Sequence, residues 1–223
     1  MNVNADFSQR VVLHGPQIEW IETRMKGVKR RMLDRMGAES GHATSIVSYA
    51  PNSHFSAHVH TGGEEFIVLD GVFQDEHGDF PVGSYIRNPP ESSHTPGSDE
   101  GCVIFVKLWQ FDPKDRTEVK VSFDNIEAVS VEGRDGVSIK PLFKDDRENV
   151  RLEEWDAGSE IELQDDGGIE ILVLDGDFKE GDDHLQKHSW LRVPMGETLN
   201  AIVGEKGAKV WVKTGHLRFV ERS

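Results

Sequence analysis

Residues 54–71 read HFSAHVHTGGEEFIVLDG, and this stretch carries the strongest structural signal in the chain. His58 and His60 are two residues apart, and on a β-strand such residues point to the same face. A Gly-Gly turn follows, and the next apolar run begins with Glu64 and Glu65. Because side chains alternate along a strand, only one of these glutamates faces inward with the histidines. Two imidazoles buried side by side are costly unless they are paired or metal-bound, so the stretch predicts a metal site.

The same pattern occurs a second time further along the chain. Residues 62–73, GGEEFIVLDGVF, match residues 167–178, GGIEILVLDGDF, at eight of twelve positions. The offset of 105 residues also pairs Pro89 with Pro194. Because the matches keep their order, they indicate a tandem duplication of one fold.

Both copies consist of short β-type runs separated by Gly, Pro, Asn and Asp, without long helical periodicity. This pattern is typical of an antiparallel sandwich or barrel. We place the boundary near residue 125, which gives a first domain at 1–125 and a second at 126–223. The strands predicted in the first copy are Thr44–Ala50, Phe55–His60, Glu65–Asp70, Ser84–Asn88 and Cys102–Trp109. Those predicted in the second copy are Val150–Trp155, Glu160–Leu163, Ile169–Asp175, Trp190–Val193 and Ala208–Lys213.

The composition narrows the possible partners and the compartment. Lys and Arg number 25 against 40 Asp and Glu, so the net charge is −15, which argues against binding to nucleic acid or to an anionic membrane. The single cysteine, Cys102, excludes an internal disulfide and a Cys-rich zinc module. The apolar runs are far shorter than the roughly 18 residues that span a bilayer, and no signal peptide is readable. We therefore expect a cytoplasmic protein.

The chemistry-bearing residues fit two motifs of the cupin family. The first motif is H-x-H, three or four residues, E, six residues, G, and it is matched by His58, His60, Glu64 and Gly71. The second motif runs G, five residues, P-x-G, two residues, H, three residues, N. It is matched by Gly83, Pro89 and His94, whereas Glu91 replaces the second glycine and Ser98 replaces the asparagine.

The resemblance to cupins implies an all-β protein with two tandem double-stranded β-helix (jelly-roll) barrels, a bicupin. It also implies one divalent metal ion per chain, held in the first barrel by His58, His60, Glu64 and His94. Three imidazoles and a carboxylate suit Zn²⁺, Fe²⁺, Mn²⁺ or Ni²⁺, and we expect zinc first. These four ligands complete a tetrahedral zinc site, but they leave two open positions on an octahedral ion.

Residues 7–113 are similar to the cupin domain of ChrR-type anti-sigma factors. In that family an N-terminal zinc-binding domain with an H-x-x-x-C-x-x-C signature clamps an extracytoplasmic-function sigma factor, and this chain lacks that signature. The resemblance therefore implies the metal site and a sensing role in transcription regulation, but not sigma-factor inhibition. A more distant resemblance is to acetylacetone-cleaving iron cupins, which use a three-histidine site.

Two functions follow as hypotheses. One is a regulatory protein that senses a small organic ligand or reactive oxygen species, with an extracytoplasmic-function sigma factor as the protein partner to test. The other is a mononuclear metal-dependent dioxygenase that acts on a small organic substrate, for which the catalytic residues are unknown. The chain is expected to be a monomer or a homodimer.

The second copy is expected to have lost the metal site. At the offset of 105, the four ligand positions become Leu163, Asp165, Ile169 and Leu199. Three apolar residues and one carboxylate cannot replace three imidazoles and a glutamate.

Three further residues of the first copy have open roles. His54 is either a surface residue near the site or a helper in proton transfer. Glu65 is expected to face outward, because its equivalent Glu170 persists in the copy without ligands. Cys102 is expected to be a small buried residue, because a redox-sensing thiol must be exposed and of low pKa.

Overall fold

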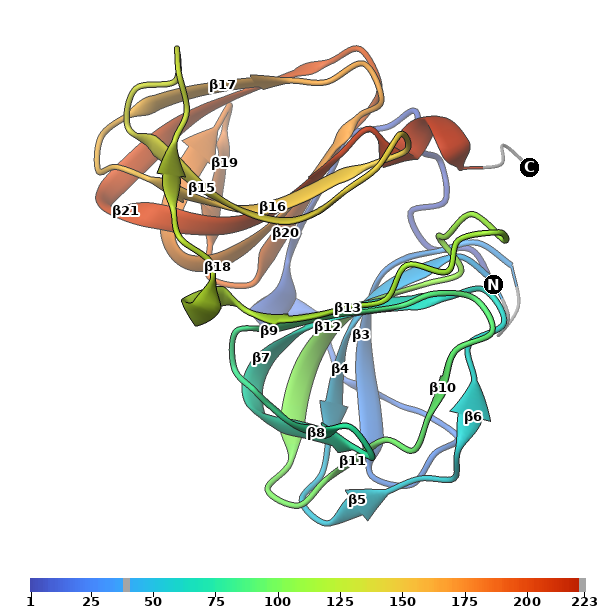
Figure 1. Cartoon of the computed structure of the whole chain (residues 1–223). Helices are drawn as coiled ribbons and strands as arrows, with labels where there is room; N and C mark the ends of the chain where they lie inside the picture. The colour runs from blue at the N-terminus through green and yellow to red at the C-terminus, as the bar shows by residue number, and fades with distance from the viewer. Residues whose placement is uncertain (38–40, 221–223) are drawn as a thin grey trace. The chain divides into compact units, whose positions relative to one another are not determined.

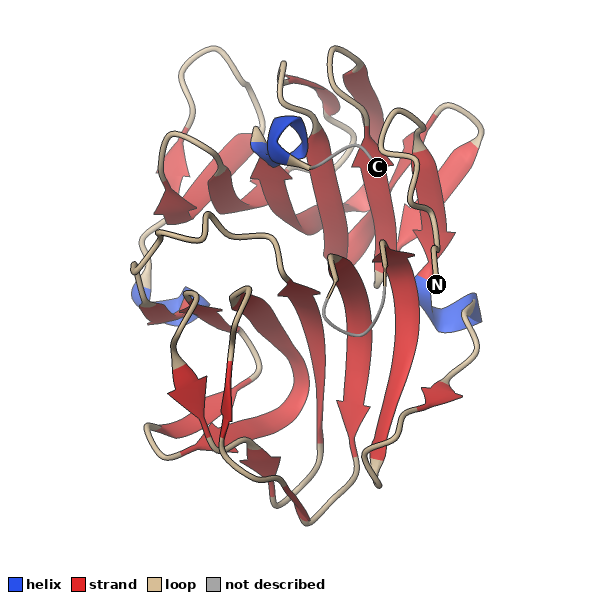
Figure 2. Cartoon of the chain, turned by 90° about the vertical axis from the view of Figure 1, so that its right-hand side faces the viewer, coloured by secondary structure: helices blue, strands red, loops and turns tan. Residues whose placement is uncertain are grey.

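The computed structural model describes residues 1–37 and 41–220 and divides the chain into two compact units. The first unit holds Met1–Ala5 and Ile18–Asn125, and the second holds Asp6–Gln17 and Ile126–Ser223. Within the described residues, almost all regular structure is β-strand, and only three short 3-10 helices interrupt it (Figure 2). The predicted all-β class is therefore confirmed. No helix in the described part of the chain is long and apolar enough to cross a membrane.

The first unit contains a ten-stranded antiparallel sheet and a separate two-stranded sheet. Its elements are β2 (Ile21–Glu22), β3 (Val28–Arg35), β4 (Ala43–Tyr49), β5 (Ser53–His54), β6 (His58–Val59), β7 (Glu64–Asp75), β8 (Gly78–Pro81), β9 (Ser84–Asn88), β10 (Ser93–His94), β11 (Gly97–Ser98), β12 (Cys102–Leu108), β13 (Val119–Ser122) and η2 (Phe123–Asn125). The large sheet has the order β13-β9-β7-β12-β4-β3-β2, with β8 and β11 on β7 and β5 on β11. β6 and β10 pair only with each other and lie together beside the large sheet (Figure 1).

The second unit forms one nine-stranded antiparallel sheet. Its elements are β1 (Val11–His14), η1 (Gly15–Gln17), β14 (Val129–Ser130), β15 (Val137–Lys144), β16 (Asn149–Trp155), β17 (Glu160–Gln164), β18 (Ile169–Glu180), β19 (Asp183–Gln186), β20 (Ser189–Val193), β21 (Thr198–Thr214) and η3 (His216–Phe219). The strand order is β1-β20-β18-β21-β16-β15-β14, with β17 on β21 and β19 on β18. The predicted strands of both copies are present, although β7, β18 and β21 are longer than expected, and the predicted strand Phe55–His60 is reduced to the two residues of β6.

The N-terminal segment differs from the expected domain at 1–125. Residues 6–17 belong to the second unit, where β1 pairs with β20 from Val11 opposite Arg192 to His14 opposite Ser189. In the first unit β13 occupies the equivalent edge, beside β9. The Arg192 guanidinium also lies 4.0 Å from the centre of the Phe7 ring, which adds a cation–π contact to the ladder. The four residues of β1 show no periodicity that would assign them to a distant strand.

Each unit has its own apolar core. In the second unit 17 buried residues form one cluster that includes Leu163, Ile169 and Leu199. In the first unit the corresponding cluster has seven members, Phe66, Val68, Phe73, Ile86, Cys102, Ile104 and Val106. We call the face of the large sheet that carries this cluster its inner face. Among the described residues, backbone hydrogen bonds do not close either unit into a cylinder, so the predicted pair of closed barrels is not confirmed.

The repeated Val-Leu-Asp-Gly sequence has the same structural cause in both units. Gly71 has φ +67° and Gly176 has φ +69°. A Cβ atom on either glycine would lie 2.0 Å from a carbonyl oxygen, that of Gly101 or that of Gly207. Only glycine fits this positive φ and this close approach of two strands.

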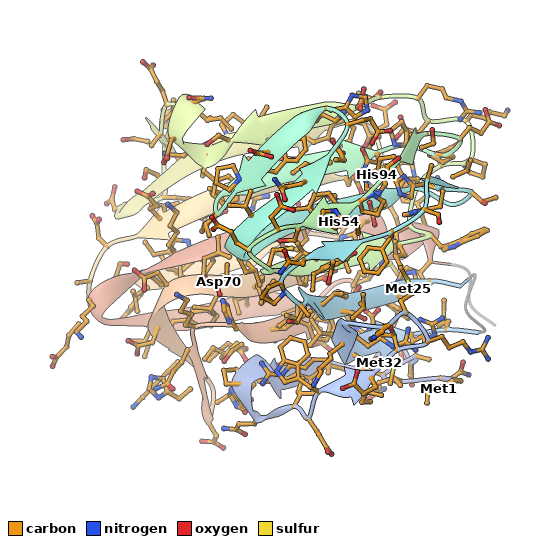
Figure 3. All side chains as sticks on the ribbon, turned by 90° about the horizontal axis from the view of Figure 1, so that it is seen from below. Met1, Met25, Met32, His54, Asp70 and His94 are labelled. Carbon is orange, nitrogen blue, oxygen red and sulfur yellow. The ribbon has the colours of Figure 1, made fainter. Side chains whose placement is uncertain are left out.

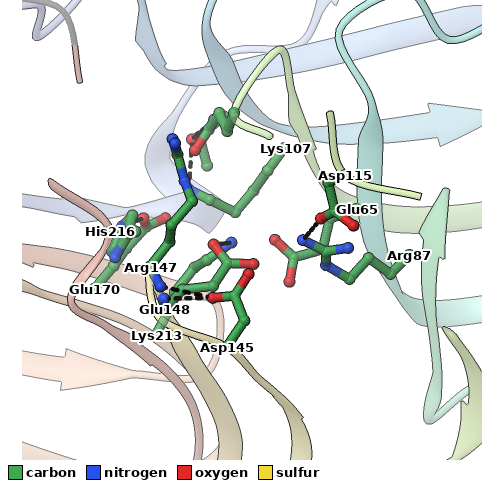
Figure 4. Close-up of polar contacts among 12 residues, drawn as sticks. Glu65, Arg87, Lys107, Asp115, Asp145, Arg147, Glu148, Glu170, Lys213 and His216 are labelled. Atoms are coloured by element: carbon green, nitrogen blue, oxygen red, sulfur yellow. Dashed lines mark hydrogen bonds and ion pairs between the residues drawn. The ribbon is translucent and has the colours of Figure 1, made fainter. Parts of the chain in front are cut away.

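The face opposite the core carries buried charges in each unit. In the first unit Glu65 lies opposite Arg87 on β9 and Lys107 on β12, and Arg87 makes a 2.6 Å ion pair with Asp115 (Figure 4). In the second unit Glu170 takes the position of Glu65, and its carboxylate lies 2.9 Å from the His216 ring. Glu65 also accepts a 2.6 Å hydrogen bond from the Tyr85 hydroxyl. These contacts give Glu65, the glutamate that is predicted to face outward, a structural role.

Candidate metal centre

Three histidines of the first unit converge on one point. His58 on β6 lies directly opposite His94 on β10 in the two-stranded sheet. His60 follows β6 and is fixed by its backbone, because its N–H donates to the Ser92 carbonyl at 2.8 Å. One ring nitrogen of each histidine lies within 4.8 Å of the others, which is close enough for a single metal ion. Within residues 1–37 and 41–220, this is the only group of three or more potential ligands.

Glu64, the fourth predicted ligand, reaches the same point from the start of β7. Its Oε2 atom lies 3.3 Å from Nε2 of His60 and 3.6 Å from Nε2 of His94. The same oxygen accepts a 3.2 Å hydrogen bond from the Asn88 side chain. The structure therefore brings together all four residues that the sequence predicts, although only the three histidines form the compact ligand group.

The Nδ1 atoms of the three rings orient them for metal binding. Ser92 donates its hydroxyl hydrogen to the Pro89 carbonyl at 2.6 Å, so its oxygen can accept from Nδ1 of His60, 3.1 Å away. Nδ1 of His94 lies 3.3 Å from a carboxylate oxygen of Asp75, and Nδ1 of His58 lies 3.5 Å from the Ser56 carbonyl. Each partner is an acceptor, which places the ring proton on Nδ1 and leaves the Nε2 lone pair for a metal.

The protonation behaviour of the site fits a metal that is bound by neutral imidazoles. Burial, together with the neighbouring His58, lowers the pKa of His60 to about 4. Burial also lowers the pKa of His94, against the opposing effect of Glu64, and it raises the pKa of Glu64. Nε2 of His60 is buried and makes no hydrogen bond. A divalent cation would satisfy this nitrogen and neutralise the buried carboxylate.

The site is buried on one side and open on the other. His60 and His94 are 6% and 3% exposed, whereas His58 is exposed and its neighbour Val59 is 60% exposed. On the buried side, the His94 ring lies 5.7 Å from the ring of Phe73, which belongs to the inner-face cluster. A metal bound here would be reachable from solvent past His58 while its other side faced apolar residues.

Two other residues from the sequence analysis lie outside the ligand group. His54 is exposed and makes a 3.1 Å contact with the exposed Asp99, so it is a surface residue of β5 (Figure 3). Cys102 is 3% exposed, and burial raises the pKa of its thiol to about 11. The thiol therefore stays protonated near neutral pH, which is the opposite of a reactive sensor cysteine.

Asp75, Ser92 and Asn88 orient the ligands and were not found from the sequence. Each lies near a motif residue, but carboxylates, serines and amides are common in turns. Only the tertiary structure shows that these three point at imidazoles or at Glu64.

Comparison with known proteins agrees with the sequence and the geometry. Residues 8–112 match the family model described as the ChrR cupin-like domain. No curated protein matches the chain.

Solved structures support the cupin fold for the whole chain. A protein from Nostoc punctiforme described as a putative dioxygenase is 17% identical, with a TM-score of 0.80 over 94% of this chain and 84% of that one. The bacterial pirin YhhW from Escherichia coli in complex with nickel(II) is 13% identical, with a TM-score of 0.64 over 92% and 98%. A cupin 2 conserved barrel domain protein from Leptotrichia buccalis is 11% identical, with a TM-score of 0.59 over 87% and 92%. At these identities the likeness is one of fold.

The second unit has other residues at the positions equivalent to the four ligands. Leu163 on β17 lies opposite Leu199 on β21, in the register that His58 and His94 have in the first unit. Both leucines and Ile169 belong to the buried apolar cluster. Asp165, the equivalent of His60, accepts a 2.8 Å hydrogen bond from the Gly167 backbone within a turn.

Proposed function

We propose that the ChrR cupin-like domain binds one divalent metal ion per chain through His58, His60, Glu64 and His94. The observation that carries this proposal is the convergence of one ring nitrogen from each of three histidines whose Nδ1 atoms have acceptor partners. Zinc is the first expectation, and iron, manganese and nickel are the alternatives with open coordination positions. The second unit is proposed to be a second cupin double-stranded β-helix that binds no metal at the equivalent place.

We further propose that the metal is the point at which the protein senses a small molecule. The match to the ChrR cupin-like domain supports this regulatory role. Because His58 is exposed, a ligand could reach the metal from solvent on this side. Because the Cys102 thiol is buried and protonated, a response to oxidants would act through the metal and its ligands.

The second candidate function is that of a dioxygenase for a small organic substrate. The exposed side of the site favours it, because an octahedral iron, manganese or nickel ion would keep positions open there. The bound metal would supply Lewis acidity and, for iron, oxidation–reduction chemistry. The residues of the chain would hold the ion, exclude water on the Phe73 side and keep the Nδ1 protons in place.

Elemental analysis of protein purified without added metal, with oxygen uptake measured on the same sample, separates these functions. One zinc per chain without oxygen uptake supports the sensory role. Iron, manganese or nickel with uptake in the presence of a substrate supports the dioxygenase. A metal content well below one per chain, which loading with Zn²⁺, Fe²⁺, Mn²⁺ and Ni²⁺ does not restore, contradicts the metal site itself.

The sigma-factor partner needs a separate binding experiment. Purified sigma factor from the same cell should bind at micromolar concentration if the protein regulates it directly. Absence of binding would leave small-molecule sensing without this partner. Size-exclusion chromatography with light scattering distinguishes between a monomer and a homodimer.

A further inference from the structure

Arg30 points onto the inner face of the first unit. On β3 it lies opposite Val47 of β4, Val47 lies opposite Ile104 of β12, and Ile104 lies opposite Val68 of β7. Ile104 and Val68 are members of the buried apolar cluster, and Val47 packs against it. Because directly opposed residues share a face, the Arg30 side chain extends over the same face as these apolar residues. Met32, two residues along β3, lies on this face as well (Figure 3).

The guanidinium of Arg30 has no partner among the described residues. Its Nε atom is buried and makes no hydrogen bond, and the described chain offers Arg30 no ion pair. Eight buried side-chain nitrogen or oxygen atoms lack a hydrogen bond, and six of them belong to residues that have other interactions. The remaining two are Nε of Arg30 and Nε2 of His60. A metal ion would satisfy Nε2 of His60, and an anion would satisfy the buried Nε of Arg30, whose side chain is half-buried.

The second unit shows how a charge on this face is satisfied when no ligand is needed. In the second unit, Ile139 and Glu153 are the opposed pair that is equivalent to Arg30 and Val47. Glu153 is fully buried. Glu153 accepts two hydrogen bonds from Arg134, at 2.9 and 2.7 Å, and one each from Arg151 and Trp155, at 2.8 and 2.7 Å. The chain therefore supplies every partner for the inner charge of the second unit but none for that of the first.

We propose that Arg30 binds the carboxylate of a small organic acid whose other end approaches the metal ligands. Arginine binds carboxylates with two parallel hydrogen bonds, and apolar neighbours strengthen such a contact. A singly charged carboxylate fits better than a phosphate dianion, because Arg30 offers the ligand one cation and the chain carries a net charge of −15. The proposal rests on the metal site proposed above, and it names the chemical class of the ligand.

The test uses metal-loaded full-length protein and isothermal titration with succinate, acetate, methyl phosphate and succinamide as probes. We expect a carboxylate to bind at least tenfold more tightly than succinamide, and Arg30→Gln to weaken that binding at least tenfold. Lys29→Gln is the matched control, because Lys29 is the next residue of β3 and its exposed side chain pairs with Glu22. It should change the affinity less than twofold. The proposal is overturned if no carboxylate of the set binds, if methyl phosphate binds best, or if Arg30→Gln leaves binding unchanged.

A second measurement works without metal and keeps the two proposals separable. Arg30→Met should raise the melting temperature of the metal-free protein, because it removes a partly buried charge that lacks a partner. Succinate should raise the melting temperature of the metal-free wild type but not that of Arg30→Met. A lower melting temperature for Arg30→Met overturns the inference. If the protein contains no metal while binding still depends on Arg30, the metal site fails and the carboxylate site stands. If the protein binds one metal per chain but carboxylate binding does not depend on Arg30, the metal site stands and the carboxylate site fails.

Discussion

The two units use the same register for opposite purposes. In the first unit His58 lies opposite His94, and in the second Leu163 lies opposite Leu199. Around the leucines the strands are continuous, since β17 has five residues and β21 has 17. Around the histidines the corresponding stretches are divided into β5 and β6 on one side and β10, β11 and β12 on the other. The first unit thus gives up ladder hydrogen bonds and apolar burial where it gathers its ligands.

Side chains replace the lost ladder in the first unit. Gln74 and Asp75 at the end of β7, and Glu76 directly after it, hold the segment that contains His94. Gln74 accepts a 2.7 Å hydrogen bond from the Asp99 backbone, and Glu76 accepts one of 2.7 Å from the Thr95 backbone. Asp75, between them, faces the His94 ring. In the second unit, the equivalent residues Lys179 and Glu180 pair with β21 through the backbone alone. The comparison teaches that the segment with His94 is held by side chains in addition to the short β6–β10 and β11–β7 pairings.

The comparison is tested most strongly by removing one ligand from the first unit. His60→Ala removes a buried imidazole whose Nε2 faces Glu64, so the metal content should fall from one per chain to nearly zero. Asp165→Ala is the matched control in the second unit, and it should leave one metal per chain. Elemental analysis after gel filtration measures both. If Asp165→Ala halves the content, the second unit binds metal and the proposed division of roles is wrong.

The second prediction concerns the apolar interior of the second unit. Leu199 is fully buried in the 17-residue cluster, so Leu199→Ala should lower the free energy of unfolding by about 2–5 kcal/mol. Ile202 on the same strand is 60% exposed, and Ile202→Ala should cost less than about 1 kcal/mol. Urea unfolding followed by fluorescence measures the difference. Equal costs at the two positions would mean that the equivalent of the metal site is not a packed core.

Acidification should affect the first unit through its histidines. The folded-state pKa of His60, about 4, lies below the ordinary value of 6.5, so protonation favours the unfolded chain. The contribution of neutral His60 to the free energy of unfolding is complete above pH 6.5. It falls by up to about 3 kcal/mol as the pH drops toward 4. The lowered pKa of His94 acts in the same direction, whereas the raised pKa of Glu64 opposes this effect. Bound metal should leave near pH 6.5 or below, because protons compete for the same nitrogens.

Urea unfolding of metal-free protein from pH 7 to pH 4.5 measures this effect, with His60→Leu as the reference. The wild type should lose more stability than His60→Leu over this range. If the two proteins have parallel pH profiles, His60 is not buried in its neutral form.

Much of the fold and of the ligand set follows from local sequence. The strands Ser84–Asn88 and Cys102–Leu108 have turn residues at both ends and β-branched or aromatic residues inside, so their positions are readable. The inward pair His58 and His60 follows from the two-residue period of a strand, whereas Glu64 and His94 follow from the resemblance to the two cupin motifs. The placement of β1 beside β20 depends on a contact some 180 residues away, and nothing within four residues indicates it. The same holds for Asp75 and Arg30, whose roles depend on what lies across the sheet.

The smallest expected effect concerns Asp75. It tests the difference between the two units through a single hydrogen bond to a ligand. Its side chain is 2% exposed, its Oδ1 accepts a 2.7 Å hydrogen bond from the His77 backbone, and its Oδ2 faces Nδ1 of His94 at 3.3 Å. Asp75→Asn keeps the shape but removes the charge that favours a proton on Nδ1, so metal affinity should fall about tenfold. Glu180→Gln is the matched control, because Glu180 occupies the equivalent place and pairs with Arg10. It should leave metal affinity unchanged. Competition with a chromophoric chelator measures both variants, and an unchanged affinity for Asp75→Asn would mean that the turn contact with His77 is the whole role of this carboxylate.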